Sequence, residues 1–282
     1  MNKLSMDKKA AVISGLVEGC SVRSVSRMTG VAKGTILRLL ADIGMACAAF
    51  HDLTVRNVRA QRVQVDEIWS FVGAKQKNVT PEMRESRPCG DVWTFVAIEA
   101  QTKLVISWLL GSRDAGCATA LLSDLQERVT NRIQLTTDGH RMYLTAVPDA
   151  FGPTGIDYAM LVKIYGNDLE GQKRYSPAQC LGVQASTILG DPDPKHVSTS
   201  YVERQNLTMR MNMRRFTRLT NAFSNKLENH GHTVALFYMH YNFCRIHQSL
   251  RVTPAMETGI SQHVWSIPEI IALAENSVAR AA

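Results

Sequence analysis

The sequence predicts an α/β domain built on a mixed sheet and preceded by a small all-α domain. Three observations support this fold class. Residues 7–47 carry apolar side chains at helical spacing. Residues 62–111 have the pattern of three apolar strands with short links, which is typical of an antiparallel meander. Beyond residue 111, helical and strand-like segments alternate, as they do where helices cover a sheet.

Composition limits the class of protein. A chain of 282 residues accommodates one large domain and a small one, and 45% hydrophobic with 20% charged residues is typical of a soluble globular protein. The net charge of +7 suits a polyanionic partner. The six cysteines form no CxxC pair, so we expect reduced thiols in the cytoplasm and neither a zinc site nor a disulfide framework. No apolar run approaches the length of a membrane span, so no membrane partner is expected.

The N-terminal segment, residues 1–50, is predicted to form a helix-turn-helix DNA-binding domain. Gly30 permits a tight turn between two short helices, and the second helix of such a motif enters the major groove. Basic residues outnumber acidic ones nine to four in residues 1–60, which favours DNA. A plain three-helix bundle with solvated basic residues is the alternative. The expected DNA contacts near the start of the third helix are Lys33, Thr35 and Arg38.

The rest of the chain divides into three predicted parts. Residues 51–61 form a linker, residues 62–250 the α/β domain, and residues 251–282 a C-terminal tail with a short helix. Residues 167–196 are rich in Gly, Pro, Asp and Lys and are expected to form a loop insertion.

Local expectations concern three further segments. Residues 74–90, which are charged and contain two prolines, are expected to form a hairpin loop. A short helix after residue 140 is expected to stop at Pro148. Residues 198–218 are expected to be helical.

The strand predicted over Arg62–Gly73 contains two adjacent carboxylates, Asp66 and Glu67. Neighbouring residues in a strand point to opposite faces, so one carboxylate faces a cation or cleft while the other faces elsewhere. Desolvating an unpaired carboxylate is costly, so a partner is expected. A strand end at which both acids are simply hydrated is the alternative.

Two more acids extend this pattern. Asp138 ends the predicted fourth strand, and Glu203 lies in the helix after the fifth. If the first and fourth strands are neighbours and that helix crosses the sheet, all three carboxylates converge. Mg²⁺ prefers such oxygen ligands, and two ions together stabilise both oxygens of a phosphodiester displacement. Each acid also has a structural alternative, because Asp138-Gly139 is a common turn and Ser200 with Glu203 has the spacing of a capping box.

Three segments, VDEIWSFVG, QLTTDGH and STSYVERQNLTMR, resemble the three sequence blocks of DDE transposases with an RNase H-like fold, in particular those of the insertion-sequence-one group. The resemblance covers most of residues 62–250. It implies that Asp66, Asp138 and Glu203 are the catalytic, metal-binding triad and hold two Mg²⁺ ions, for which Mn²⁺ can substitute. Many relatives in that group carry a cysteine zinc motif before the helix-turn-helix, and this chain has none.

The resemblance also indicates residues near DNA. Arg210 matches a basic position that follows the catalytic glutamate in this family. Seven residues make about two helical turns, so Arg210 shares a face with Glu203. Asn206 and Arg214 are expected near that face and near DNA. His140 and His196 are candidates for handling protons or contacting phosphate, although a lone histidine is more often structural.

These observations predict a DNA transposase of a bacterial-type insertion sequence. It would bind double-stranded DNA at terminal inverted repeats, cut the element ends with two metal ions, and join the 3′-OH ends to target DNA. Joining two ends at one target favours a homodimer or a higher homo-oligomer. The alternatives are an RNase H-like nuclease or recombinase that cuts without joining, and a helix-turn-helix regulator whose second domain dimerises.

Overall fold

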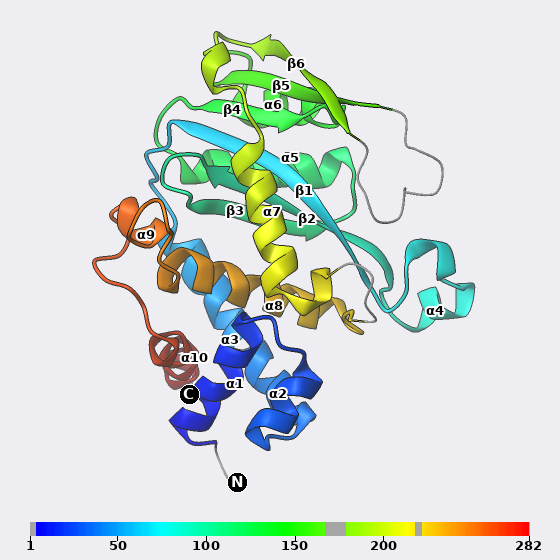
Figure 1. Cartoon of the computed structure of the whole chain (residues 1–282), viewed down its shortest axis with the longest axis vertical. Helices are drawn as coiled ribbons and strands as arrows, with labels where there is room; N and C mark the ends of the chain where they lie inside the picture. Colours follow the sequence, from blue (N-terminus) through cyan, green and yellow to red (C-terminus); the bar gives the residue numbers. More distant parts are fainter. Residues whose placement is uncertain (1–3, 167–178, 218–221, 282) are drawn as a thin grey trace.

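The computed structural model describes residues 4–166, 179–217 and 222–281, with side chains as far as residue 275 (Figure 1). A six-stranded sheet forms the upper half of the molecule in Figure 1, and the N-terminal helices lie at the lower end. The strands are β1 (Arg62–Val72), β2 (Gly90–Glu99), β3 (Val105–Gly111), β4 (Gln134–Asp138), β5 (Asp157–Tyr165) and β6 (Cys180–Leu189).

The sheet is mixed, as predicted, with the strand order β3-β2-β1-β4-β5-β6. Strands β1, β2 and β3 form the expected antiparallel meander. The first and fourth strands are neighbours, because β4 pairs parallel to β1 and β5 pairs parallel to β4. At the far edge, β6 is antiparallel to β5. The α/β class and the central neighbour relationship are therefore confirmed.

Alternation along β1 separates the two faces of the sheet. Val63 and Val65 belong to the hydrophobic cluster that also includes residues of α5 (Ala115–Arg128) and α6 (Tyr143–Phe151). Ile68 belongs to a second cluster with residues of α7 (Ser200–Asn212) and α8 (Leu227–Met239). The odd-numbered residues of β1 thus face α5 and α6, and the even-numbered ones face α7 and α8.

Helix α8 is apolar around most of its circumference because it is packed on two sides. Val234 and Tyr238 contact the sheet cluster, whereas Leu236 and Met239 belong to the cluster that includes the N-terminal helices. A side chain at Gly44 would place its Cβ only 2.5 Å from Cβ of His232, so only glycine allows this close approach of α3 to α8.

Three N-terminal helices are present, namely α1 (Met6–Val17), α2 (Val22–Thr29) and α3 (Lys33–Thr54). Gly30 ends α2 in the left-handed region, with φ of 70°, as expected for the tight turn. Helix α3 continues into the segment predicted as a linker, because Cys47 and His51 are buried on its inner face. In the tail, α9 (Pro254–Glu257) precedes α10 (Ile267–Ala281), which packs on α1 and α3.

The structure corrects the expected loop at 167–196. Residues 180–189 form strand β6, while 167–178 lie outside the described residues. Most residues of β6 are exposed at the sheet edge, so the strand lacks the apolar pattern of a buried one. Its backbone pairing with β5 stabilises it instead.

Three smaller expectations hold only in part, although the connection from β1 to β2 does join antiparallel strands. Helix α6 continues through Pro148 to Phe151, because Ala146 and Val147 remain buried and one missing amide hydrogen bond does not end it. Helix α7 ends at Asn212, where buried Met213 leaves helical geometry with φ of −124°, and a 3₁₀ turn (Arg214–Phe216) follows. The expected hairpin loop contains a 3₁₀ turn (Gln76–Asn78) and α4 (Pro81–Ser86), which Thr80 caps.

Two short segments complete the description, a 3₁₀ turn (Pro194–His196) before α7 and a π-helical turn (His240–Cys244) after α8. Within the described part of the chain, every helix is too short or too polar to cross a membrane.

Candidate active site

Parallel pairing brings two of the predicted acids together. Val65 of β1 is paired with Thr137 of β4, so the next residues, Asp66 and Asp138, lie side by side. Carboxylate oxygens of Asp66, Glu67 and Asp138 all lie within 4.8 Å of one another. Asp138 also stabilises the turn predicted at Asp138-Gly139, because its Oδ1 accepts a hydrogen bond of 3.0 Å from the His140 amide.

The environment of Asp66 disfavours its charged form. Burial raises the pKa of Asp66 to about 7, and the nearby carboxylates of Glu67, Asp138 and Glu203 add to the shift. Two hydrogen bonds hold the carboxylate in place. The Glu67 amide donates to Oδ1 at 2.8 Å, and Asn206 Nδ2 donates to Oδ2 at 2.9 Å.

Glu67 points to the opposite face of β1, as alternation predicts. Its side chain is fully buried and pairs with Arg113 at 2.5 Å, and the Tyr143 hydroxyl donates to it at 2.9 Å. Burial and the charge of Asp138 raise the pKa of Glu67, while Arg113 opposes that shift. Arg113 also lies 3.9 Å from Asp138 and stacks on Trp93, so one guanidinium links the two acids.

Glu203 is positioned by the start of α7. Oε1 of Gln64 accepts hydrogen bonds from the Tyr201 and Val202 amides, at 2.8 and 3.1 Å. Because Gln64 and Asp66 are two residues apart in β1, they point to the same face and fix α7 over the strand. The Glu203 carboxylate accepts hydrogen bonds from Lys163 Nζ and, at 2.6 Å, from the Thr199 hydroxyl.

The predicted capping box at α7 is not formed. The Ser200 amide donates to Ser198 Oγ at 3.1 Å, which leaves the Glu203 carboxylate free of that role. Lys163 pairs with Glu203 from the neighbouring strand β5. Burial alone would lower the pKa of Lys163, but its hydrogen bond to Glu203 raises the pKa above the ordinary value.

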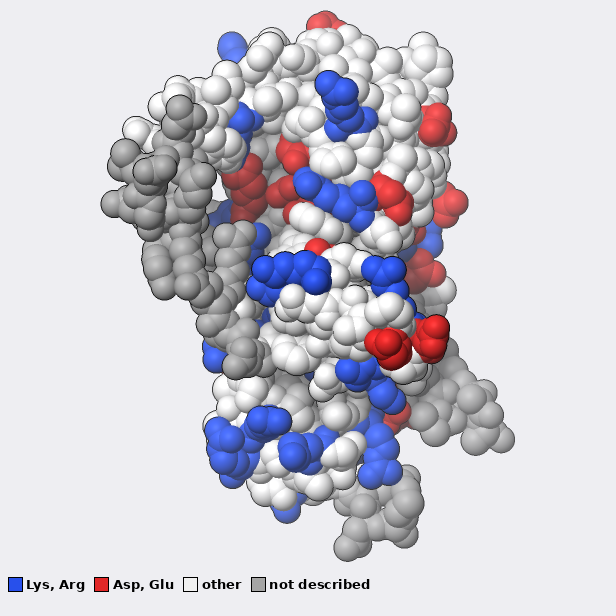
Figure 2. Space-filling model, turned by 90° about the vertical axis from the view of Figure 1, so that its right-hand side faces the viewer, with Lys and Arg blue, Asp and Glu red and all other residues white. Residues whose placement is uncertain are grey.

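All three predicted acids line one cavity of about 450 Å³, together with His140, Lys163 and Thr199. Asp66, Asp138 and Glu203 reach it from β1, β4 and α7. Figure 2 shows carboxylates gathered in a recess in the upper half of one face, while Lys and Arg are frequent at the lower end, where the N-terminal helices lie. The structure thus brings the three acids together as the sequence predicts.

The other residues predicted on or near α7 lie in different surroundings. Asn206 is only 4% exposed, and a contact with DNA would require its amide to leave Asp66. Arg210 is half-buried on α7. Arg214 lies beyond the end of the helix and is exposed, so it does not share the face of Glu203. Of the two histidines, His140 lines the cavity, whereas His196 lies 2.6 Å from Arg62 outside it.

Residues predicted to read DNA lie in the first turns of α3. Lys33 and Arg38 are exposed and Thr35 is half-buried. At about 100° per residue, Thr35 and Arg38 lie on a different side of the helix from Lys33. The three side chains are therefore divided between two faces of α3.

The donor set at the acid cavity fits a hard divalent cation. Carboxylate oxygens are the ligands that Mg²⁺ and Mn²⁺ prefer, and those of Asp66, Glu67 and Asp138 lie close enough to share one ion. Glu203 is not part of that group, but it lines the same cavity as Asp66 and Asp138. Burial and repulsion from the neighbouring carboxylates both raise the pKa of Asp66, and a cation at this position would relieve the repulsion. Next to Asp66, buried Oδ1 of Asn206 has no hydrogen-bond partner among the described residues.

Sequence reasoning placed Glu67 on the opposite face of the strand and missed its contact with Asp138. It also missed Lys163, Arg113 and Tyr143. The one available signal was a lysine inside the apolar segment AMLVKIYG, where a charge needs a partner or solvent.

Comparisons with known proteins add the following. The sequence matches no known protein family, and no curated protein is similar enough to match it. Among solved structures, it is similar to a piggyBac transposase in a synaptic complex with hairpin DNA, at 11% identity and a TM-score of 0.42, over 98% of this chain and 73% of that chain.

Two Mos1 structures are also similar. The strand transfer complex of Mos1 has 13% identity and a TM-score of 0.25, over 56% of this chain and 59% of that chain. The Mos1 mariner paired-end complex with Mn has 11% identity and a TM-score of 0.27, over 86% of this chain and 78% of that chain. TM-scores below 0.5 do not by themselves assign a fold or an activity to this chain.

Proposed function

We propose that this chain is a DDE-type DNA transposase of an insertion sequence, with an RNase H-like catalytic domain. The observation that carries the proposal is the convergence of Asp66, Asp138 and Glu203 in one cavity from two parallel strands and a crossing helix. The strand order β3-β2-β1-β4-β5 supports the RNase H-like assignment, because it brings the ends of β1 and β4 together. Assignment to the insertion-sequence-one group rests on the three sequence blocks alone.

Asp66, Asp138 and Glu203 would hold two Mg²⁺ ions, for which Mn²⁺ would substitute. Bound metal supplies charge stabilisation to the attacking and leaving oxygens of a phosphodiester displacement. Glu67 is committed to Arg113 and Tyr143 and would support the site without leaving those partners.

Protein groups around the acids have separate tasks. Gln64 and Asn206 hold α7 and Asp66 in one arrangement, which limits the reorganisation needed before reaction. Lys163 places a positive charge beside Glu203, where it would balance the carboxylate before metal enters. His140 lines the same cavity and would exchange protons with water or the leaving oxygen there.

DNA contacts would come from two regions of the chain. Residues 1–50 would act as a helix-turn-helix domain for the terminal inverted repeats, with Lys33, Thr35 and Arg38 on its second helix. Arg210 and Arg214 would contact the backbone closer to the cut. Residues 51–61 would link this domain to the catalytic domain, residues 62–250. Joining two ends at one target would require a homodimer or a higher homo-oligomer.

A strand-transfer assay tests this function. The full-length protein is incubated with a DNA fragment that carries the element's own end and with a supercoiled target plasmid, in Mg²⁺ or in EDTA. A transposase yields Mg²⁺-dependent cleavage at the end and covalent joining to the plasmid. Cleavage without joining would instead identify a nuclease or recombinase, and binding without cleavage a regulator.

A further inference from the structure

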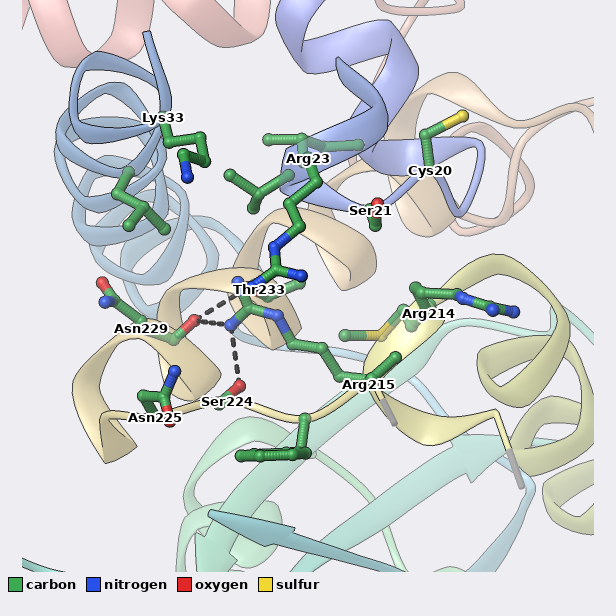
Figure 3. Close-up of a pocket in the computed structure, with 16 residues that line it drawn as sticks. Cys20, Ser21, Arg23, Lys33, Arg214, Arg215, Ser224, Asn225, Asn229 and Thr233 are labelled. Atoms are coloured by element: carbon green, nitrogen blue, oxygen red, sulfur yellow. Dashed lines mark hydrogen bonds between the residues drawn. The ribbon is translucent and has the colours of Figure 1, made fainter. Parts of the chain in front are cut away.

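A second cavity, which we call the basic cavity, lies between the N-terminal helices and the segment that follows α7 (Figure 3). Its volume is about 570 Å³. Arg23 reaches it from α2 and Lys33 from α3, while Arg214 and Arg215 reach it from the 3₁₀ turn after α7. Residues far apart in the sequence therefore line one hollow outside the acid cavity.

The lining of the basic cavity is positively charged. Among the described residues, its lining contains these four cations and no carboxylate. Arg23, Lys33 and Arg214 are exposed, so an extended polyanion can reach them from solvent. Figure 3 shows Arg23 extending from α2 toward the side of the cavity where the Arg215 guanidinium lies. Cations gathered in this way repel one another unless an anion lies among them.

Arg215 is the most constrained of the four. Its Nη1 donates to Ser224 Oγ at 2.9 Å and to the Asn229 carbonyl, as the dashed lines in Figure 3 show. Burial lowers the pKa of Arg215 to about 10, and no carboxylate counters that shift. A guanidinium has five N–H donors, and its acceptors among the described residues are two, Ser224 Oγ and the Asn229 carbonyl, so donors remain for an anion. Desolvation of an unpaired cation is costly, so the site favours an anion.

We propose that the basic cavity binds a phosphate of the DNA backbone. Guanidinium groups suit phosphate because their N–H groups match its oxygens in pairs. A phosphate of DNA is favoured over a free phosphate ion for two reasons. Three of the cations are exposed to solvent, and the cavity lies between the helices predicted to bind DNA and the end of α7. This inference rests on the proposed function for its choice of polyanion.

Helix α7 relates the two sites. Glu203 lies in its first turn, and Arg214 is the second residue after its end. At 1.5 Å per residue, the two positions are roughly 16 Å apart along the helix axis. That distance corresponds to a rise of about five base pairs along a duplex. A duplex with its scissile phosphate at the acids is therefore long enough to bring another phosphate to the basic cavity.

Arg23→Ala, Arg214→Ala and the double variant test the inference in the full-length chain. Affinity for a short mixed-sequence duplex is measured as a function of salt. Each single variant should bind roughly threefold to tenfold more weakly at physiological salt, with a shallower salt slope. If both arginines hold one phosphate, the double variant should lose less than the product of the single losses. Arg27→Ala, on the same helix but outside the cavity, is the matched control.

Inorganic phosphate provides the second arm. At equal ionic strength, replacing chloride with phosphate should raise the melting temperature of the wild type and raise it much less in the double variant. Stabilisation by phosphate with unchanged DNA affinity in the variants would identify a free anion and overturn the assignment to DNA. Equal weakening by Arg27→Ala, or losses that multiply in the double variant, would also overturn it.

The two proposals fail separately. If the wild type cleaves and joins DNA while the variants bind DNA normally, only the basic cavity has been misassigned. If the wild type neither cleaves nor joins, the proposed function is wrong, and the DNA and phosphate titrations still decide whether the basic cavity binds a DNA phosphate.

Discussion

Asn206 of α7 donates a hydrogen bond of 2.9 Å to Asp66 of β1, across 140 positions of sequence. The same strand caps the start of α7 through Gln64. Each of these contacts joins a residue of β1 to a residue of α7. They therefore fix Asp66, on the strand, relative to Glu203, on the helix. A buried amide that orients a carboxylate is a common way to prepare a metal ligand.

Replacing Asn206 with alanine should therefore reduce catalysis more than stability. We expect Mg²⁺-dependent cleavage to fall about 10- to 100-fold, as for other groups that orient metal ligands. The unfolding free energy should fall by about 1 kcal/mol, since one buried hydrogen bond is lost. Cleavage rates and denaturant unfolding check this, with Asn212→Ala at the far end of α7 as control. Unchanged cleavage would make Asn206 a packing residue only.

Removal of Arg113 should destabilise the fold through Glu67. The buried carboxylate would lose its cation, and breaking such a pair costs about 2–3 kcal/mol when the partner is partly exposed, as Arg113 is at 35%. Glu67→Gln in the same background should restore part of that loss, because no buried charge then remains unpaired. Denaturant unfolding of the single and double variants measures both effects. Equal stability of Arg113→Ala and the double variant would show that Glu67 does not depend on Arg113.

Lys163 pairs with the carboxylate of Glu203, which we propose as a metal ligand, so the ammonium would compete with the metal. We expect Lys163→Met to tighten Mn²⁺ binding by about twofold to fivefold, the size of a partly exposed ion pair. Titration of free Mn²⁺ by electron paramagnetic resonance measures the affinity, with Lys195→Met outside the cavity as control. Weaker Mn²⁺ binding in Lys163→Met would mean that the ammonium supports the metal site instead.

His230 should make the protein sensitive to acid. It is fully buried, 3.1 Å from both Ser70 and Ser224, and burial lowers its pKa from 6.5 to about 3, with the charge of Arg215 adding to the shift. Below pH 6.5 His230 binds a proton in the unfolded chain but stays neutral in the folded chain. The unfolding free energy therefore falls as the pH drops toward 3.

His230→Gln should be less stable at neutral pH but lose less stability on acidification. Melting temperatures across that pH range check the prediction, and His196→Gln, at an exposed histidine, should keep the wild-type slope. A slope in His230→Gln as steep as in the wild type would assign the acid sensitivity to other groups.

The sequence predicted those parts of the site that depend on local pattern. Asp66 lies within an apolar strand, Asp138 ends another, and Glu203 lies in a helix in which Val202 and Met209 recur at helical spacing, so strand and helix periodicity placed all three. Lys163 and Arg113 were missed because their partners lie on other elements of the fold. Which elements become neighbours depends on the strand order and on where α7 packs, and periodicity does not encode either. The edge strand β6 was missed because backbone pairing stabilises it while its side chains remain largely exposed.

Cleavage and joining by Asp66→Asn, Asp138→Asn and Glu203→Gln test the central claim most directly. These substitutions remove one ligand charge each while nearly preserving shape, and Asp149→Asn, at an exposed acid of α6, is the matched control. We predict that each triad variant binds DNA but loses Mg²⁺-dependent cleavage and joining. Mg²⁺ should raise the melting temperature of the wild type and of the control, but not that of any triad variant. Joining at the wild-type rate by any triad variant would contradict the assignment of that residue, and by all three would contradict the proposed active site.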